Sequence, residues 1–309
     1  MNNVGEESRE IGRSWVTPRA RIIAVWVVVS IAFLVTALSV WWASSLAAWS
    51  GDIALIGFYV VVLGGFSVLS VWPPRWVRVF AWALLAGVLA SALRVGNLRS
   101  GSWNTALIPL GLLVASVVVL VSNRRTTIAT RVSAPLTFPL AEGNWYIAQG
   151  GGRLLNHHKR VLAQRAALDL IRLRSDGRRA AGLFPSNPQD YGAYGSVVVS
   201  PCGGVLTEVV DGMDDEIPMR PRPGPPAGNH VVIDTGKETV LLAHLKRGSV
   251  RVRKGDKVSP GQPIGRVGNS GNSTEPHLHI HAEREGLGLQ LAFTPPTGRL
   301  HRGRRIRAS

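Results

Sequence analysis

Cysteine is nearly absent from this chain, because Cys202 is the sole cysteine among 309 residues. An intramolecular disulfide is therefore impossible, and a metal site built from several thiolates is excluded. Any metal must be held by histidine and carboxylate side chains. Cys202 lies in a Pro-Cys-Gly-Gly turn without a base and an orienting carboxylate in the same motif. We interpret it as a small turn residue rather than a nucleophile.

Acidic residues are also scarce. The chain has 19 of them against 35 lysines and arginines, which gives a formal net charge of +16. Such a charge suits nucleic acid, anionic lipid or an acidic cell-wall polymer. The sequence has no helix-turn-helix pattern, no zinc-finger spacing and no basic strand interleaved with aromatic residues. We therefore expect no nucleic-acid partner.

Long apolar runs, by contrast, fill the amino-terminal part of the chain. After a basic tail over residues 1–21, four charge-poor runs predict membrane-spanning helices. Every tryptophan except Trp145 lies at or before Trp103, and several flank the proposed ends of the spans, where interfacial aromatics belong. We expect an α-helical transmembrane bundle of four spans in residues 22–122, with three spans as the alternative. The spans are expected at about residues 22–43, 53–72, 77–93 and 106–121.

The arginines bear on the orientation of these spans. They are frequent in the amino-terminal flank, in the second connection (Arg75 and Arg78) and just after the fourth span (Arg124 and Arg125). The positive-inside rule then favours a cytoplasmic position for both ends of a four-span bundle. Three or five spans would place the ends on opposite sides, and a long translocated domain can override loop charge.

The residue pattern of the sequence changes after an expected linker at residues 123–138. From residue 139 to residue 298, short runs of β-type residues alternate with Gly, Asn, Asp and Pro, which predicts a mainly antiparallel β domain. Residues 299–309 form a basic stretch that we expect to be a mobile or surface-bound tail.

Particular strands are predicted within this domain. The runs at 230–234 and 239–244, joined by a short turn that contains glycine, predict a β-hairpin. The runs at 196–200, 250–253 and 263–267 predict further strands.

Histidines gather at one place near the carboxyl end. His277, His279 and His281 account for three of the eight histidines and follow a His-x-His-x-His pattern. Alternate residues of a strand point to the same face, so these three imidazoles are expected on one side. Two or more imidazoles on one face form half of a metal site. The alternative is a polar surface strand that happens to carry histidines.

Two further stretches carry residues of the same chemical type. One is Asn156-His157-His158 followed by Asp169, and the other is Ala243-His244-Leu245. Zinc hydrolases use three protein ligands and leave a position open for water, whose pKa the metal lowers to about 7. Nearby imidazoles can accept a proton or stabilise an oxyanion. The histidines and the carboxylate supply the side chains that this chemistry needs.

These stretches resemble the lysostaphin-type, or LytM-like, zinc metallopeptidases, which cut peptide cross-bridges in peptidoglycan. The resemblance covers about residues 140–295 and rests on Ala243-His244-Leu245, on Gly268-Asn-Ser-Gly271 and on Pro276-His-Leu-His279. It implies a lysostaphin-like β domain with a duplicated hybrid motif. It also implies one Zn²⁺ per domain, with His279 and Asp169 as ligands and His277 and His244 as catalytic residues.

The chain departs from the family pattern at three positions. The common motif is His-x-x-x-Asp, which would require a histidine where this chain has Arg165. The resemblance then leaves His157 and His158 as candidates for the remaining ligand, and we prefer His158. Leu242 stands where many relatives have tyrosine. His281 replaces a residue that is often acidic, and we expect it either behind the ligands or at the surface.

The sequence and the resemblance together predict a multi-pass, membrane-anchored zinc metalloendopeptidase that hydrolyses peptide bonds in peptidoglycan cross-links. The lipid bilayer and a peptidoglycan or other peptide substrate are the expected partners. The peptidase domain is expected to be extracytoplasmic, although the arginine distribution argues for the cytoplasm. One alternative is a catalytically inactive relative that binds cell-wall fragments or regulates another hydrolase. A biotinyl- or lipoyl-type carrier domain is a third reading, against which the His-x-His motif argues.

Overall fold

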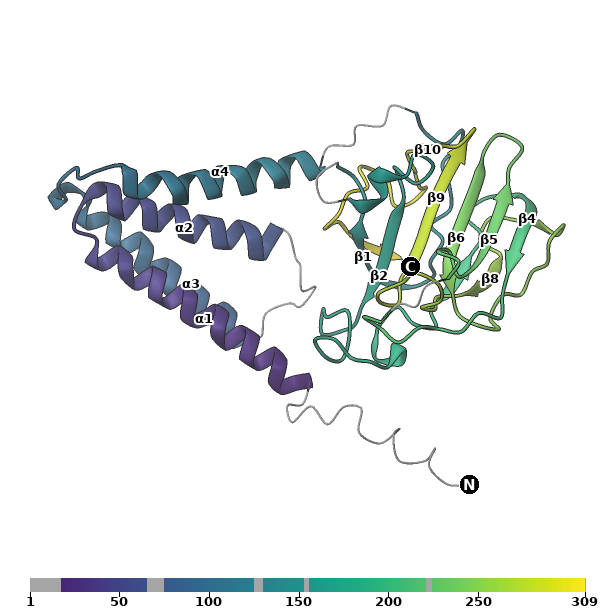
Figure 1. Cartoon of the computed structure of the whole chain (residues 1–309), viewed down its shortest axis with the longest axis horizontal. Coiled ribbons are helices and arrows are strands. Elements are labelled where there is room, and N and C mark those ends of the chain that lie inside the picture. The colour runs from purple at the N-terminus through teal and green to yellow at the C-terminus, as the bar shows by residue number, and fades with distance from the viewer. Residues whose placement is uncertain (1–17, 66–74, 125–129, 153–155, 221–223, 309) are drawn as a thin grey trace, which may run out of the picture.

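The computed structural model describes residues 18–65, 75–124, 130–152, 156–220 and 224–308 of the chain. A group of helices and a β domain make up two distinct parts, which Figure 1 shows side by side. The helical part contains α1 (Pro18–Trp42), α2 (Leu46–Gly65), α3 (Arg75–Ser91), the short helix η1 (Ala92–Asn97) and α4 (Asn104–Arg124).

The helices expose apolar side chains to their surroundings. Val28, Trp82 and Ile108 are 66%, 71% and 74% exposed, as suits contact with lipid rather than water. Two stretches of the described chain, Val79–Asn97 and Asn104–Arg124, are long and apolar enough to cross a membrane. Val27–Trp42 and Leu46–Val61 are apolar but shorter. The count of four spans therefore stays a prediction, and part of the expected second span lies outside the described residues.

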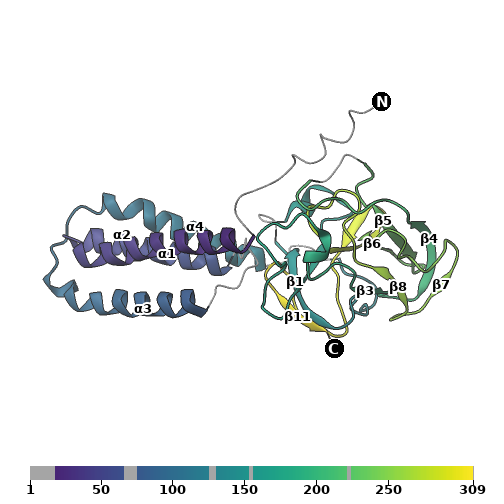
Figure 2. The same ribbon diagram turned by 90° about the horizontal axis from the view of Figure 1, so that it is seen from below.

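Consecutive helices run in opposite directions (Figure 1). The backbone N–H of Leu46, at the start of α2, donates to the carbonyl of Arg99 at 2.6 Å, so the α1–α2 connection lies beside the segment that leads into α4. Trp49 on α2 also donates through Nε1 to Ser91 Oγ at 3.0 Å. In Figures 1 and 2, α1 begins and α4 ends at the same end of the bundle, where the β domain lies.

The β domain is built on one nine-stranded sheet in which every pairing is antiparallel. Its strands follow the order β11-β1-β2-β9-β6-β5-β4-β7, and β10 pairs with β9. A second, two-stranded sheet pairs β3 with β8. The bounds are β1 Gly143–Gln149, β2 Leu168–Leu173, β3 Val197–Val199, β4 Gly204–Val210, β5 Asn229–Asp234, β6 Thr239–Leu245, β7 Lys257–Val258, β8 Pro263–Arg266, β9 Leu278–Arg284, β10 Leu287–Leu289 and β11 Arg305–Ala308. Short helices lie at η2 (His157–Arg160) and η3 (Pro188–Asp190).

The antiparallel β architecture and the predicted β5–β6 hairpin are thus confirmed, whereas the strand expected at residues 250–253 is wrong. There the N–H of Arg251 donates to Ile264 O at 3.0 Å. The neighbouring N–H of Val250 instead donates to the carboxylate of Asp211 at 3.2 Å. Because the N–H of Val250 binds the Asp211 side chain, it is not available for backbone pairing with a neighbouring strand. The segment therefore lies alongside β8 but does not form a strand with it.

The carboxyl end of the chain also differs from expectation. Residues Arg305–Ala308 of the expected tail form the edge strand β11 and pair with β1. Ile306 is 3% exposed, while the flanking Arg305 and Arg307 point outward. One buried apolar side chain between two exposed arginines is enough to give a basic segment the alternation of a half-buried strand.

The expected linker is partly attached to the β domain. Val132 donates its N–H to Gln290 O at 3.2 Å, and Leu136 donates to Ala292 O at 2.8 Å. Between them, Ser133 binds the carboxylate of Glu238 through both its N–H and its hydroxyl, at 2.8 and 2.7 Å. The stretch around Ser133 is therefore packed on the domain.

The core lies on one face of the central strands. Leu168 and Leu170 on β2, and Leu278 and Ile280 on β9, are at most 2% exposed and belong to one apolar cluster. Because side chains alternate along a strand, the residues between them are directed to the other face of the sheet. Asp169 lies between the two leucines of β2, so the face opposite the core receives its carboxylate.

Candidate active site

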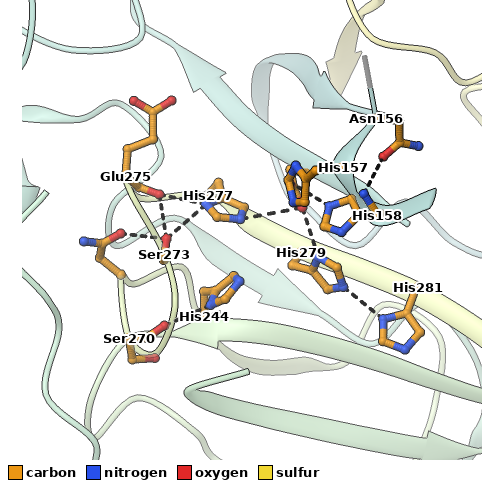
Figure 3. A network of polar contacts seen from close by, with 12 residues as sticks. Asn156, His157, His158, His244, Ser270, Ser273, Glu275, His277, His279 and His281 are labelled. Carbon is orange, nitrogen blue, oxygen red and sulfur yellow. Dashed lines mark hydrogen bonds and ion pairs between the residues drawn. The ribbon is translucent and has the colours of Figure 1, made fainter. Parts of the chain in front are cut away.

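A single buried carboxylate, that of Asp169, is the centre of the site. Asp169 on β2 is paired directly with His279 on β9, which places the two side chains next to each other on one face. His279 Nδ1 lies 3.0 Å from Asp169 Oδ1, and His158 Nε2 lies 2.9 Å from Oδ2. Figure 3 shows the rings of His158 and His279 close to each other. Two histidines from distant parts of the chain thus meet one carboxylate through its two oxygens.

His158 is brought to Asp169 by a short helix. The side chain of Asn156 caps η2 by accepting the N–H of His158 at 3.1 Å. His158 is 6% exposed. The side chain of His157, one residue earlier, is 62% exposed, and its Nε2 lies 4.0 Å from Asp169. Of the two candidates that the sequence left open, His158 is therefore the one in hydrogen-bonding contact with the carboxylate.

The position where the family motif would place a histidine has another role here. Arg165 donates through Nε to the carbonyl of Gly288 at 3.1 Å. Gly288 in turn donates its N–H to Leu162 O at 2.9 Å. Arg165 thus attaches the segment that follows η2 to strand β10.

His277 lies beside the pair formed by Asp169 and His279. Its Nε2 is 3.6 Å from Asp169 Oδ1. Its Nδ1 lies 2.7 Å from the carbonyl oxygen of Glu275 and 3.2 Å from Ser273 Oγ. A carbonyl can only accept, so Nδ1 carries the proton and donates it. The unprotonated Nε2 of a neutral His277 then faces the site.

His244 is held in the same way from the neighbouring strand. Its Nδ1 donates to the carbonyl of Ser270 at 2.9 Å, which leaves Nε2 without a proton in the neutral ring. The ring centroids of His244 and His277 are 4.7 Å apart. Two imidazoles, each fixed as the Nδ1–H tautomer by a backbone carbonyl, therefore stand together, as Figure 3 shows.

A β-bulge explains how His244 reaches this face. Leu242 pairs with Ile280 on the core side, so a regular strand would return to the core at His244. Instead, the register of β6 against β5 shifts here, and His244 has a positive φ of 62°. Leu245, rather than His244, then rejoins the core. The bulge turns His244 toward Asp169, a device that is common beside functional sites.

Burial sets the charge state of these groups. Burial opposes a charge on Asp169, but attraction to His277 and hydrogen bonds with His158 and His279 outweigh it and hold the pKa of the carboxyl well below its ordinary value. Burial lowers the pKa of His277 and His279, and it lowers that of His244 well below the ordinary value. At pH 7 the site therefore combines the carboxylate of Asp169 with neutral rings of His244, His277 and His279.

His281, whose position the sequence left open, is buried and not at the surface. It is 6% exposed, and its Nδ1 lies 2.9 Å from Nε2 of His279. Burial lowers the pKa of His281 to about 3, so its ring is neutral. Leu242, the other departure from the family pattern, is fully buried in the core and does not line the site.

Sequence reasoning missed a residue that supports the site. The guanidinium of Arg179 is buried and forms an ion pair with the carboxylate of Glu275. It also lies over the rings of Tyr191 and Phe184, at 5.6 and 5.3 Å. Nothing in the local sequence marks Arg179, since its partner lies almost a hundred residues later in the chain.

The donor set fits a divalent metal ion. In the described part of the chain, ligand atoms of His157, His158 and Asp169 lie within 4.8 Å of one another, and His279 meets the second oxygen of Asp169. Zinc–ligand bonds of about 2.0–2.1 Å in a tetrahedral site place ligand atoms about 3.3 Å apart. The contacts of 2.9 and 3.0 Å around Asp169 are close to that spacing. Neutral imidazoles and an ionised carboxylate are also the forms that bind metal.

Comparison with known proteins finds a family similarity within the β domain. Residues 189–290 match peptidase family M23. Over these residues the β domain is similar to peptidase family M23. The matched residues include His244, His277 and His279, whereas Asp169 and His158 lie before them.

The chain is also similar to individual proteins. Over 65 residues, the chain is 46% identical to the peptidoglycan DD-endopeptidase ShyA of Vibrio cholerae. This alignment covers 21% of the present chain and 15% of that relative, so most of the relative's length has no counterpart in the alignment.

Solved structures give more distant similarities. A zinc-containing peptidase from Vibrio cholerae is 22% identical, with a TM-score of 0.28 over 56% of this chain and 40% of that one. The catalytic domain of lysostaphin from Staphylococcus simulans is 19% identical, with a TM-score of 0.27 over 50% of this chain and 85% of that one.

Proposed function

We propose that this chain is a membrane-anchored zinc metalloendopeptidase that hydrolyses peptide bonds in peptidoglycan cross-links. The observation that carries the proposal is the contact of two buried imidazoles, His158 and His279, with the two oxygens of Asp169. The similarity to a peptidoglycan DD-endopeptidase over 65 residues supports the choice of substrate.

Three side chains would hold one Zn²⁺ in this proposal: His158 through Nε2, Asp169 through its carboxylate and His279 through Nδ1. His157 is the alternative first ligand, but its side chain is largely exposed. A bound zinc ion would polarise the scissile carbonyl and supply a water with a pKa near 7.

His277 is suited to the part of general base. Its Nε2 faces Asp169, and its Nδ1–H is fixed to the carbonyl of Glu275. It accepts a proton from water at Nε2 and can return that proton to the leaving amine. The hydrogen bond at Nδ1 persists in both protonation states, so the ring keeps its direction during the transfer.

His244 is suited to a second role in proton handling. With its proton on Nδ1, the neutral ring presents an acceptor at Nε2. It can donate to a developing oxyanion only after it has gained a proton at Nε2. His244 and His277 thus act as a pair in which either ring can take the proton.

The helices are proposed to form a multi-pass anchor with the β domain on the extracytoplasmic side, where peptidoglycan lies. A four-span bundle would place residue 18 and the β domain on the same side, because α1 begins where α4 ends. The arginine distribution favours the cytoplasm for that side. Digestion of intact spheroplasts with an added protease tests the orientation. A domain that is cleaved only after lysis contradicts peptidoglycan as the substrate.

The function is tested with the full chain purified in detergent. Wild type should contain close to one zinc per chain and release peptides from purified peptidoglycan. His279→Ala should lose both zinc and cleavage, whereas His277→Ala should keep zinc and lose cleavage. His230, which lies on β5 and binds Gly228 O and Glu208, provides the control variant His230→Ala. If wild type binds zinc and muropeptide but does not cleave, the result favours the alternative hypothesis of a catalytically inactive relative that binds cell-wall fragments.

A further inference from the structure

The third histidine of the His-x-His-x-His motif has no part in the proposed reaction. His281 lies on β9 two residues after His279, on the same face of the sheet, and is 6% exposed. Its Nδ1 lies 2.9 Å from Nε2 of His279, on the side of the ring that is turned away from Asp169. Figure 3 shows the two rings joined at this contact.

We propose that His281 is a positioning residue for the metal ligand His279, whose Nε2–H it accepts through Nδ1. The proposal rests on the zinc centre described above. A ring that binds zinc through Nδ1 carries its single proton on Nε2. That proton needs an acceptor because the surroundings are buried, and His281 Nδ1 is the atom in place.

The geometry favours a hydrogen bond over simple packing. The centroids of the two rings are 5.2 Å apart and the ring planes are inclined by 74°. The rings therefore meet edge-on rather than face to face. Nitrogen of one ring meets nitrogen of the other at 2.9 Å. If the role of His281 were packing alone, the two nitrogens would not need to face each other. Isoleucine or leucine could then fill the same space with more apolar contact.

The contact also restricts the orientation of His279. Asp169 and His281 bind opposite ring nitrogens of the same imidazole, at 3.0 and 2.9 Å. A rotation of the ring about its Cβ–Cγ bond would break both contacts. His281 therefore preorganises Nδ1 toward the metal, as partners of ligating histidines commonly do.

The test is the zinc affinity of full-length chain in detergent, measured by competition with a chromophoric chelator. His281→Ala removes the acceptor and should weaken zinc binding about 10- to 100-fold. His281→Asn offers an amide oxygen in place of Nδ1 and should restore affinity to within a few fold of wild type. His230→Ala should leave zinc affinity unchanged. Thermal unfolding of each variant shows whether it is folded before titration.

Each outcome separates this inference from the proposed function. One zinc in wild type with weak binding by His281→Ala and near-normal binding by His281→Asn supports it. Equal affinity of wild type and His281→Ala overturns the role of His281 but leaves the zinc centre standing. Equal weakness of the Ala and Asn variants also overturns it, because ring shape rather than the acceptor then matters. Absence of zinc from wild type would overturn the centre itself.

Discussion

The buried side chain of Arg179 forms an ion pair with the partly buried carboxylate of Glu275, in the loop before His277. The backbone carbonyl of Glu275 accepts the Nδ1–H of His277 at 2.7 Å. By binding the side chain of Glu275, Arg179 fixes the position of the Glu275 carbonyl that accepts the Nδ1–H of His277. Arg179 therefore orients the proposed general base through Glu275 and not by direct contact.

We expect Arg179→Ala to lower the rate of peptidoglycan cleavage about 10- to 100-fold, because a small misplacement of His277 has such an effect. Zinc content should stay near wild type, since Asp169 and its two histidines do not contact Arg179. Breaking a largely buried pair should also lower the free energy of unfolding by about 2–4 kcal/mol. Zinc analysis, cleavage rate and thermal unfolding of the same preparation measure all three.

The neighbouring Arg178 offers a matched control. It faces Asp176 at 3.8 Å, and both side chains are partly exposed. Arg178→Ala should change neither rate nor stability by much, because exposed pairs contribute little. An equal loss of rate in both variants would point to general damage of this segment rather than to His277.

The neighbours His157 and His158 make a second comparison possible. His158→Ala should weaken zinc binding more than 100-fold, because a ligand contributes more than an outer partner, whose loss costs about 10- to 100-fold. His157→Ala should stay within a few fold of wild type, since its side chain is 62% exposed and 4.0 Å from Asp169. Chelator competition on the two variants decides between them. The reverse order of affinities would assign the ligand to His157.

Glu238 should make the stability of the β domain depend on pH. Burial opposes its charge, but hydrogen bonds from Ser133 and Arg284 outweigh it and lower the pKa of Glu238. A carboxyl whose pKa is lower in the folded than in the unfolded state stabilises the fold above the unfolded value of about 4.3. That contribution disappears as the pH falls through the lower, folded pKa.

Glu238→Gln should therefore be less stable than wild type at pH 7, by about 1.5–3 kcal/mol, which is the usual contribution of a hydrogen bond to a charged group. The difference should shrink as the pH falls below 4. Thermal unfolding at a series of pH values measures it. Glu285→Gln, at an exposed turn, serves as the control. A difference that does not vary with pH would falsify the charge-based account.

Cys202 should be slow to react. Burial, followed by the charge of Glu238, raises the pKa of its thiol to about 12. At pH 8 the thiolate fraction is then roughly a thousandfold below that of an ordinary cysteine. Alkylation with iodoacetamide should be slower by a similar factor in native than in denatured protein. Equal rates in both states would contradict the raised pKa of this thiol.

The amino-acid sequence by itself determined those features that depend on local periodicity. Alternation alone predicts that His277, His279 and His281 share a face, and glycine between two β-type runs predicts the hairpin of β5 and β6. The lack of charge over long apolar runs likewise predicts the helices of the amino-terminal part. These features follow from the geometry of a single strand or helix, which the chain carries wherever it is placed.

Only the tertiary structure decided what depends on register and on distant partners. Alternation would have sent His244 into the core, and a bulge in β6 turns it out. Strand pairing brings Asp169 to His279, which is 110 residues away in the chain, and the capping of η2 by Asn156 brings His158 to the same carboxylate. The basic segment at residues 305–308 forms strand β11 because the edge of β1 is available for pairing. The pairing also buries the side chain of Ile306. A local pattern states which way a side chain points, but the packing of other elements determines what it meets there.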